Sequence, residues 1–327
     1  MKRKLLGYAV AAVILSVIFW RIDRAEFVRL VSIMDWTWFA AGMALFIPVY
    51  LVVVARLRFM FNGQLSFRDA LMSILAASSL NIILPSKGGD LVKGIFIKKL
   101  TGRSVDESLA VVLVERVSDV SSLAIVMAIG LIFLADAGVQ EWAAWLGGAG
   151  IFVATLLYFY IHLTPNTHGW LVRMLLRVPK VGKLFSASRH LVHDLFVSRR
   201  ILKLYAYSLL LWMIHIAQFY CLFAALDYRG PIDSVIGLVP ATLIVGLIPI
   251  TVAGIGTRDA ALIVFFAPWA SAELMTGVAL FSHLRYFLPA IVGLAALRRV
   301  NALSGDAVIS DGVESDRPMA GSPSGEK

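Results

Sequence analysis

Three charged side chains lie inside a long apolar run, LAVVLVERVSDVSSLAIV, at Glu115, Arg116 and Asp119. On a helix, residues 115 and 119 share a face, and Arg116 lies three positions before Asp119. A charge at the centre of a bilayer costs at least ~2.5–3.5 kcal/mol, so these side chains should face the protein interior and have partners. Two interpretations stay open: an ion-pair network that holds the fold, or a polar cavity. In such a cavity Arg116 would contact a lipid phosphate while the carboxylates balance its charge or carry protons.

Two other stretches, LPSKGGDLVKG at 84–94 and IPITVAGIGTRD at 248–259, interrupt apolar sequence with proline, glycine and charge. In hydrocarbon, irregular backbone survives only where it is buried in protein or lines a wet cavity. Proline ends the preceding half-helix, the glycines permit positive φ, and the free amides of the next half-helix favour an anion. The candidate site residues of these stretches are Lys87, Gly88, Gly89, Asp90 and Lys93 in the first and Gly254, Gly256, Arg258 and Asp259 in the second.

The composition indicates that membrane helices position these residues. Hydrophobic residues make up 59% of the 327 and charged residues only 16%, whereas soluble domains carry about 25% charged residues. Apolar runs of ~20 residues are long enough to cross a bilayer. They predict an all-α polytopic integral membrane bundle with about six full spans, at 5–20, 36–55, 107–134, 142–162, 203–226 and 274–297. The interrupted stretches, within 70–100 and 234–268, are predicted to be re-entrant helical hairpins.

The distribution of basic residues orients this bundle, because cytoplasmic loops are enriched in Lys and Arg. Basic clusters at 2–4 and 56–68, and again at 98–103, place both flanks of the first hairpin on the cytoplasmic side. The second hairpin is flanked by loops with little basic charge and should enter from the outside. Interrupted segments in inverted orientation are typical of a transport site. Both termini are predicted to be cytoplasmic, in a cell inner membrane.

Two further segments are expected at the membrane surface. Residues 21–30 carry three arginines on the predicted outer side and fit an interfacial helix. Residues 184–203 have the apolar spacing of an amphipathic helix on the cytoplasmic surface. The chain is therefore divided into one transmembrane domain, 1–300, and a polar tail, 301–327, that is expected to be disordered.

The remaining composition narrows the classes of function. The formal charge of +9 comes from basic residues between apolar runs, so nucleic acid is not an expected partner. The single cysteine, Cys221, is read as a buried apolar side chain, and no cluster has metal-ligand spacing. No cofactor is expected. No nucleophile with an identifiable base is visible, so the chain is not expected to be an enzyme.

Additional polar side chains lie in the later spans. The last span, with LFSHLRYFLP, contributes Arg285 as a further cavity cation, while the role of His283 stays open. His215 and Gln218 in WMIHIAQFY fit interhelical hydrogen bonding.

Together the motifs LPSKGGDLVKG, KKLTGRS, SLAVVLVERVSD and IPITVAGIGTRDAAL resemble the lysylphosphatidylglycerol synthase transmembrane region family, a flippase-like module, over about residues 5–300. The resemblance implies movement of lipids with charged or sugar-bearing headgroups between leaflets. Asp259 and Lys93 stand where members often have glutamate and arginine. Synthase members add an aminoacyl-transferase domain that is not expected here, so lysyl transfer is not carried over. The matching residues are Pro85, Gly88, Gly89, Asp90, Lys93, Glu115, Arg116, Asp119, Pro249, Gly254, Gly256, Arg258 and Asp259.

The leading hypothesis is a lipid flippase or translocase without nucleotide hydrolysis of its own, in which Lys87, Arg116, Arg258 and Arg285 screen the phosphate of the headgroup. Its expected partners are membrane lipids with an anionic or phosphate-bearing headgroup, with a lipid-modifying enzyme and a second copy of the chain as further candidates. One alternative is a membrane glycosyltransferase or phosphotransferase that uses a lipid-phosphate substrate and a metal held by Asp90 and Asp119. Another is a non-transporting protein that holds such an enzyme in place.

Overall fold

The structure is a computed structural model that describes residues 2–83, 89–134, 139–164, 177–248, 250–251 and 254–297. Every regular element in these ranges is a helix, as the composition predicts. Pro85, Lys87, Gly88 and Pro249 lie outside the described residues, as does the predicted tail.

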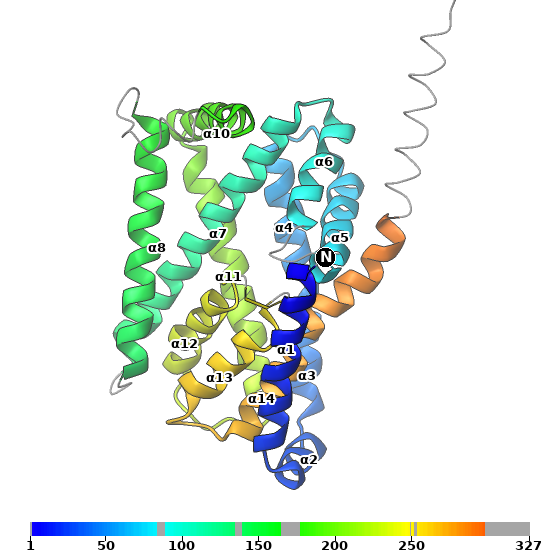
Figure 1. Ribbon diagram of the computed structural model, residues 1–327, viewed down its shortest axis with the longest axis vertical. Coiled ribbons are helices and arrows are strands. Elements are labelled where there is room, and N and C mark those ends of the chain that lie inside the picture. The colour runs from blue at the N-terminus through cyan, green and yellow to red at the C-terminus, as the bar shows by residue number, and fades with distance from the viewer. Residues whose placement is uncertain are drawn as a thin grey trace, which may run out of the picture.

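The helices run mostly along the long axis of the bundle (Figure 1). In chain order they are α1 (Lys2–Arg21), α2 (Arg24–Ser32), α3 (Trp36–Ala44), α4 (Phe46–Met60), α5 (Phe67–Ile83), α6 (Gly89–Thr101), α7 (Val105–Phe133), α8 (Val139–Leu163), α10 (Pro179–Val197), α11 (Arg200–Ala225), α12 (Ile232–Val245), α13 (Thr257–Phe266) and α14 (Ala272–Ser282). After a turn at His283 the chain is helical again over 284–297.

Five helical segments are long and apolar enough to cross a membrane: Trp36–Met60, Val105–Phe133, Trp145–Leu163, Arg200–Ala225 and Ala272–Leu297. Each overlaps one of the predicted spans after the first. The first predicted span falls on α1, but the apolar segment Ala11–Arg21 of this helix is shorter than a full span. That span therefore stays a prediction.

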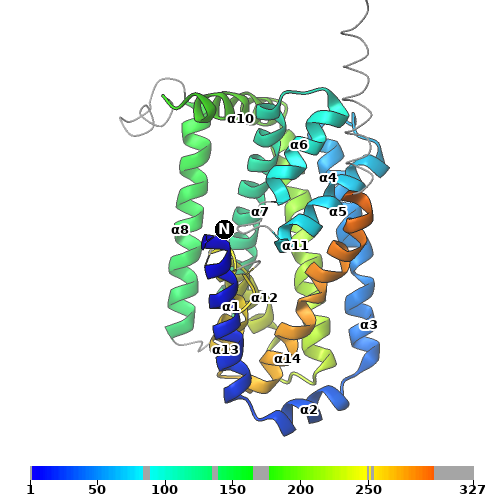
Figure 2. The same cartoon turned by 45° about the vertical axis from the view of Figure 1, so that its right-hand side comes forward.

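Helix α8 shows what surrounds the bundle. It stands at one edge of the molecule (Figures 1 and 2). Its side chains Leu146, Phe152, Val153 and Leu156 are each more than half exposed. Apolar surface on this scale would be unstable in water but is well solvated by lipid acyl chains. The chain is a multi-pass membrane protein.

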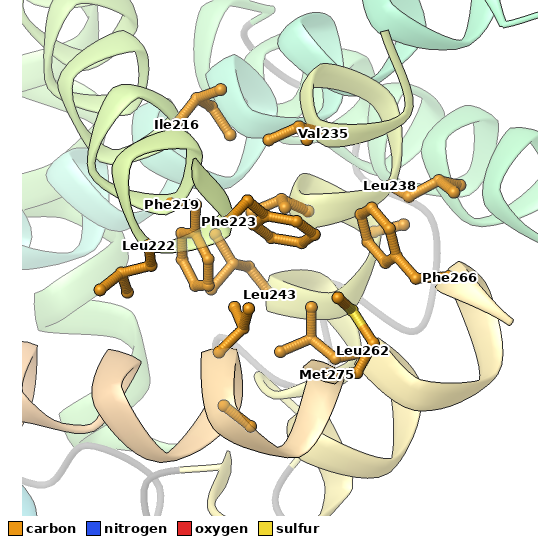
Figure 3. Packing of buried hydrophobic residues seen from close by; sticks show 14 of the residues in the cluster. Ile216, Phe219, Leu222, Phe223, Val235, Leu238, Leu243, Leu262, Phe266 and Met275 are labelled. Carbon is orange, nitrogen blue, oxygen red and sulfur yellow. The ribbon is translucent and has the colours of Figure 1, made fainter. Parts of the chain in front are cut away.

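The main hydrophobic core joins α7, α11, α12, α13 and α14. Phe223 lies at its centre, with its ring centroid 4.9 Å from that of Phe266, and Leu238, Leu262 and Met275 surround the pair (Figure 3). Helices α7 and α12 approach so closely that a Cβ built on Gly130 would lie 2.3 Å from the nitrogen of Gly237. The core fixes α12 against the long helix α7, which also carries the charged residues, and α13 packs on α12 and α14.

The two interrupted stretches each belong to a pair of packed helices, α5 with α6 and α12 with α13. The α5–α6 pair lies toward the end of the bundle where α10 sits, and the α12–α13 pair lies toward the opposite end, near α2 (Figures 1 and 2). This placement agrees with an inverted arrangement. Entry into a membrane from opposite faces stays a prediction.

The predicted surface helices are present with different bounds. Residues 24–32 form α2, whose first amides are capped by the Asp23 carboxylate. Helix α10 lies across one end of the bundle (Figure 2), as expected for a surface helix. The prediction that it continues to residue 203 is wrong, because Arg199 adopts a left-handed conformation with φ 55°. This residue ends the surface helix and starts the span α11.

Candidate functional site

Arg56 of α4 is the centre of a buried charge network. Its Nη2 donates to Glu115 Oε1 at 2.6 Å, and its Nη1 donates to the Asp119 carboxylate and, at 2.9 Å, to Ser208 Oγ. Arg56 is only 2% exposed. Residues 115 and 119 lie one turn apart on α7, so a single guanidinium reaches both, as expected from their shared face.

Two further ion pairs tie α6 to the same face of α7. Lys93 Nζ lies 2.5 Å from Glu115 Oε2, and Arg116 Nη2 lies 2.5 Å from Asp90 Oδ2. Arg116 Nη1 is also 3.8 Å from Asp119 Oδ2. Helix α6 begins at Gly89, directly after the first interrupted stretch. The pairs therefore hold the half-helix of that stretch against the long span α7.

Small and polar neighbours let the helices approach around this network. Ser118 of α7 is fully buried, and its Oγ lies 3.2 Å from Ser208 Oγ on α11. Trp212 Nε1 donates to the Asp119 carbonyl at 2.7 Å. Desolvating charges costs several kcal/mol per ion, and partners with good geometry are needed to offset that cost. The observed contacts supply such partners for all three carboxylates.

A cavity of about 210 Å³ opens beside the network. Helices α4, α5, α6, α7 and α11 and the segment 284–297 all contribute to its wall. Its charged lining residues are Arg56, Asp90, Lys93, Glu115, Arg116, Asp119 and Arg285, and its uncharged ones include Phe46, Val49, Tyr50, Val53, Ser78, Asn81, Trp212, His215 and Tyr286. The lining thus combines ionic groups with an apolar wall on α4. Such a cavity suits a ligand that is polar at one end and apolar at the other.

The second interrupted stretch forms a separate polar cluster. Asp259 Oδ2 accepts the Gly256 amide at 2.9 Å, and the carboxylate contacts Arg258 at 3.3 Å and His283 at 3.1 Å. Gly254 and Gly256 have φ of +73° and +92°, the positive φ that their sequence context predicts. Arg258 is 1% exposed and also donates to Ser282 at 3.1 Å. The open role of His283 is thereby resolved as a partner of Asp259.

The expectation that both stretches line one cavity is not met by this geometry. The lining contains Asp90, Lys93 and the three residues of α7 but none of the four residues predicted from the second stretch. The two sites meet through Tyr286, which lines the cavity and whose ring centroid lies 5.3 Å from Arg258 Cζ. Packing of α13 against α12 and α14 turns Arg258 and Asp259 inward to the end of α14, away from the network.

Arg56 is a residue of the site that was not predicted from the sequence. It was grouped with Arg58 and Arg68 as a marker of the cytoplasmic side, whereas its side chain is buried between α4, α7 and α11. Its position in LVVVARLRFM, with apolar residues on both sides, is the pattern that could have indicated a buried arginine. Arg58 differs: its Nε donates to the Leu65 carbonyl at the end of the helix.

Two smaller predictions can be placed as well. His215 Nδ1 lies 2.9 Å from Gln218 Oε1 on the same helix, and Gln218 then reaches α3 through the Gly42 carbonyl at 3.4 Å. Asp90 and Asp119, the pair considered for a metal, both contact Arg116. Within the described ranges, no group of three or more His, Cys, Asp or Glu side chains has the arrangement of a metal site. Cys221 is buried and unpaired.

Comparison with protein families gives a match over most of the chain. The family model described as "Lysylphosphatidylglycerol synthase TM region" matches residues 4–293. No curated protein matches the chain. The matched region contains both interrupted stretches, the charge network and the whole lining of the cavity.

Proposed function

On the premise that the chain belongs to the lysylphosphatidylglycerol synthase transmembrane region family, we propose that it moves a lipid with a polar, phosphate-bearing headgroup between the leaflets of a membrane. The cargo class comprises phospholipids and polyprenyl-phosphate-linked lipids. The family and the apolar helices make it a membrane protein of a lipid-handling family. Translocation is our proposal.

The observation that carries the proposal is the charged cavity inside an apolar bundle. A headgroup cannot cross hydrocarbon without losing its hydration, and an unpaired charge there is costly. The cavity beside Arg56, Glu115 and Arg116 offers ionic partners in place of water. Phe46, Val49 and Val53 line it on the same face of α4 as Arg56 and give it an apolar part, while Ile47 and Leu51 of the same helix are at least half exposed. Acyl chains would follow this apolar side while the headgroup contacts the charges.

For the orientation, we propose that the α5–α6 pair enters from the cytoplasm and the α12–α13 pair from the other side. The placement of the pairs toward opposite ends of the bundle supports this arrangement. Both termini would be cytoplasmic in a cell inner membrane, since the basic residues at 2–4 and 98–103 favour that side. The separate cluster at Asp259 and His283 would then serve the half-path from the outer side.

The test is reconstitution into vesicles with fluorescent phospholipids, read by chemical quenching of the outer leaflet. The wild-type protein is expected to expose inner-leaflet lipid at a rate above that of protein-free vesicles. Arg116→Gln should slow the exchange at least about tenfold, because it removes the positive charge that balances Asp90 and Asp119 along the path of the headgroup. Arg116 suits this test because its side chain is 39% exposed within the cavity lining.

Arg229→Gln is the matched control. Arg229 is 84% exposed and pairs only with Asp227 in the loop before α12 among the described residues, so exchange should be unchanged. Folding of each variant is checked by elution profile and thermal unfolding in detergent. If folded wild-type protein leaves leaflet exchange at the protein-free rate across phospholipids and polyprenyl phosphates, the translocase proposal is wrong.

A further inference from the structure

Among the described residues, Arg285 differs from the other three cations of the cavity lining in having no ion pair with a carboxylate. Its Nε and Nη1 are buried and donate to no hydrogen-bond acceptor among the described residues. Its guanidinium carbon instead lies 4.9 Å from the ring centroid of Phe219. An aromatic face stabilises a cation only in part and leaves the in-plane N–H groups free to bind an acceptor.

The carboxylates of the cavity are already engaged. Glu115 is bound by Arg56 and Lys93, Asp119 by Arg56 and Arg116, and Asp90 by Arg116. The described lining holds four cationic and three carboxylate side chains, which is an excess of one positive charge. That excess resides at Arg285, because the other three cations each have a carboxylate partner.

We infer that Arg285 is the anion-binding residue of the cavity, and that the site takes headgroups of net negative charge, phosphate diesters or monoesters, and disfavours cationic ones. For the identity of the ligand as a lipid, the inference rests on the proposed function. A phosphate accepts charge-assisted N–H bonds from a guanidinium, and the unbound in-plane donors Nε and Nη1 of Arg285 can supply such bonds. An amine-bearing headgroup would need a carboxylate that is not already bound, and it would be repelled by Arg285.

The position of Arg285 in the fold supports this assignment. Helix 284–297 follows the turn at His283, and it is fixed to α5 by a 2.5 Å hydrogen bond from Ser79 Oγ to the Ala290 carbonyl. Arg285 thus reaches the cavity from a helix that is anchored to α5, whereas the carboxylates Glu115 and Asp119 reach it from α7. The fully buried Arg258 lies beyond Tyr286 and is paired with Asp259, so it does not compete for the same anion. A phosphate bound in the cavity beside Arg285 would neutralise this arginine without breaking an existing ion pair.

The test is binding of short-chain lipids to the detergent-solubilised full chain. Dihexanoyl phosphatidic acid and phosphatidylglycerol are compared with the phosphatidylcholine and lysyl-phosphatidylglycerol analogues by tryptophan fluorescence. Trp212 lines the cavity, and Trp212→Phe identifies its contribution to the signal. We expect the two anionic lipids to bind at least about tenfold more tightly than the other two, with the cationic lipid weakest.

The variants assign this charge preference to one residue. Arg285→Gln should weaken the anionic lipids about tenfold or more and weaken phosphatidylcholine less, because the choline group offsets the charge of the same phosphodiester. Arg285→Lys should bind the anionic lipids with intermediate affinity, since lysine keeps the positive charge but lacks the planar guanidinium donors. Arg229→Gln should bind as wild type. If Arg285→Gln does not fold, the headgroup order of the wild-type protein and Arg285→Lys decide the question.

The outcomes distinguish a lipid headgroup from free phosphate as the ligand. They also distinguish failure of this inference from failure of the translocase proposal. Inorganic phosphate that competes only far above the lipid concentration supports a lipid headgroup, and equal competition overturns it. Equal affinity for all headgroups, or anionic binding that Arg285→Gln leaves intact, overturns the inference even if lipids move. Anion-selective binding that depends on Arg285, with no leaflet exchange, would uphold the inference and reject the translocase.

Discussion

Arg56 Nη2 and Glu115 Oε1 lie 2.6 Å apart, although the two residues are separated by 59 positions in the chain. The contact joins α4 to α7 in the interior, where Arg56 and Glu115 are each 2% exposed. A single guanidinium at this point satisfies two carboxylates of one helix face. The network consequently depends on Arg56 more than on any other cation around it.

Replacing Arg56 should therefore destabilise the fold strongly. Of the ion pairs within the described ranges, Arg56→Gln leaves Asp119 with the 3.8 Å contact to Arg116 and Glu115 with the contact to Lys93. Breaking a buried ion pair by removing one partner costs about 3–5 kcal/mol. Thermal unfolding in detergent measures the loss. Arg68→Gln, at an exposed arginine, is the control for charge alone, and equal stability of the two variants would contradict the central role of Arg56.

The sequence predicted the α7 half of this network but not its partner. Spacing on one helix is enough to place Glu115 and Asp119 on one face. The identity of the partner on α4 depends on how α4 and α7 pack and on their relative position along the bundle axis. The local sequence pattern does not encode this packing. Arg56 has the same type and neighbourhood as residues that mark a helix end, so the positive-inside rule misassigned it.

The same limit applies to the second interrupted stretch. Its glycines and capped helix start follow from local sequence, and they appear at Gly254, Gly256 and Asp259. Whether this stretch shares a cavity with the first depends on the packing of α13 and α14. Five spans were predictable because ~20 apolar residues are a strong local signal.

The approach of α7 to α12 should be sensitive to a single methyl group. A Cβ at Gly130 would lie 2.3 Å from the backbone nitrogen of Gly237, and backbone cannot move aside as a flexible side chain does. Gly130→Ala should lower the free energy of unfolding by about 1–3 kcal/mol, the usual cost of overpacking. Chemical denaturation in mixed micelles is the measurement.

Gly150→Ala is the matched control for that change. Gly150 lies in α8, also in a helix, with nothing within 4 Å of the position of a Cβ. Alanine there should be neutral or stabilising by up to about 1 kcal/mol, because glycine is a poor helix former. If both variants lose stability equally, the close α7–α12 approach is wrong.

A pair of glycines separates backbone strain from close packing at the second interrupted stretch. Gly63 and Gly254 have similar φ, +76° and +73°, but only Gly254 is crowded: its Cβ would lie 2.6 Å from the Gly246 carbonyl oxygen. Gly63→Ala should cost roughly 1–2 kcal/mol from the left-handed conformation alone. Gly254→Ala should cost more, as read by thermal unfolding. An equal loss at both positions would mean that the chain around Gly254 is not packed against Gly246.

A buried hydroxyl, that of Ser188, links the surface helix α10 to the end of α8. Ser188 Oγ is 0% exposed and lies 2.8 Å from His162 Nε2 at the end of α8. Ser188→Ala removes this bond and leaves the imidazole nitrogen without it, at a cost of about 1–3 kcal/mol for an unsatisfied buried group. Because α10 lies at the end of the bundle, the effect should be local opening rather than global unfolding. Hydrogen exchange of the α10 amides should accelerate, while α11 amides stay protected. Ser186→Ala, two residues away on the exposed side of the same helix, should leave exchange unchanged. Equal acceleration in both variants would show that helix propensity, not the link to His162, holds α10 in place.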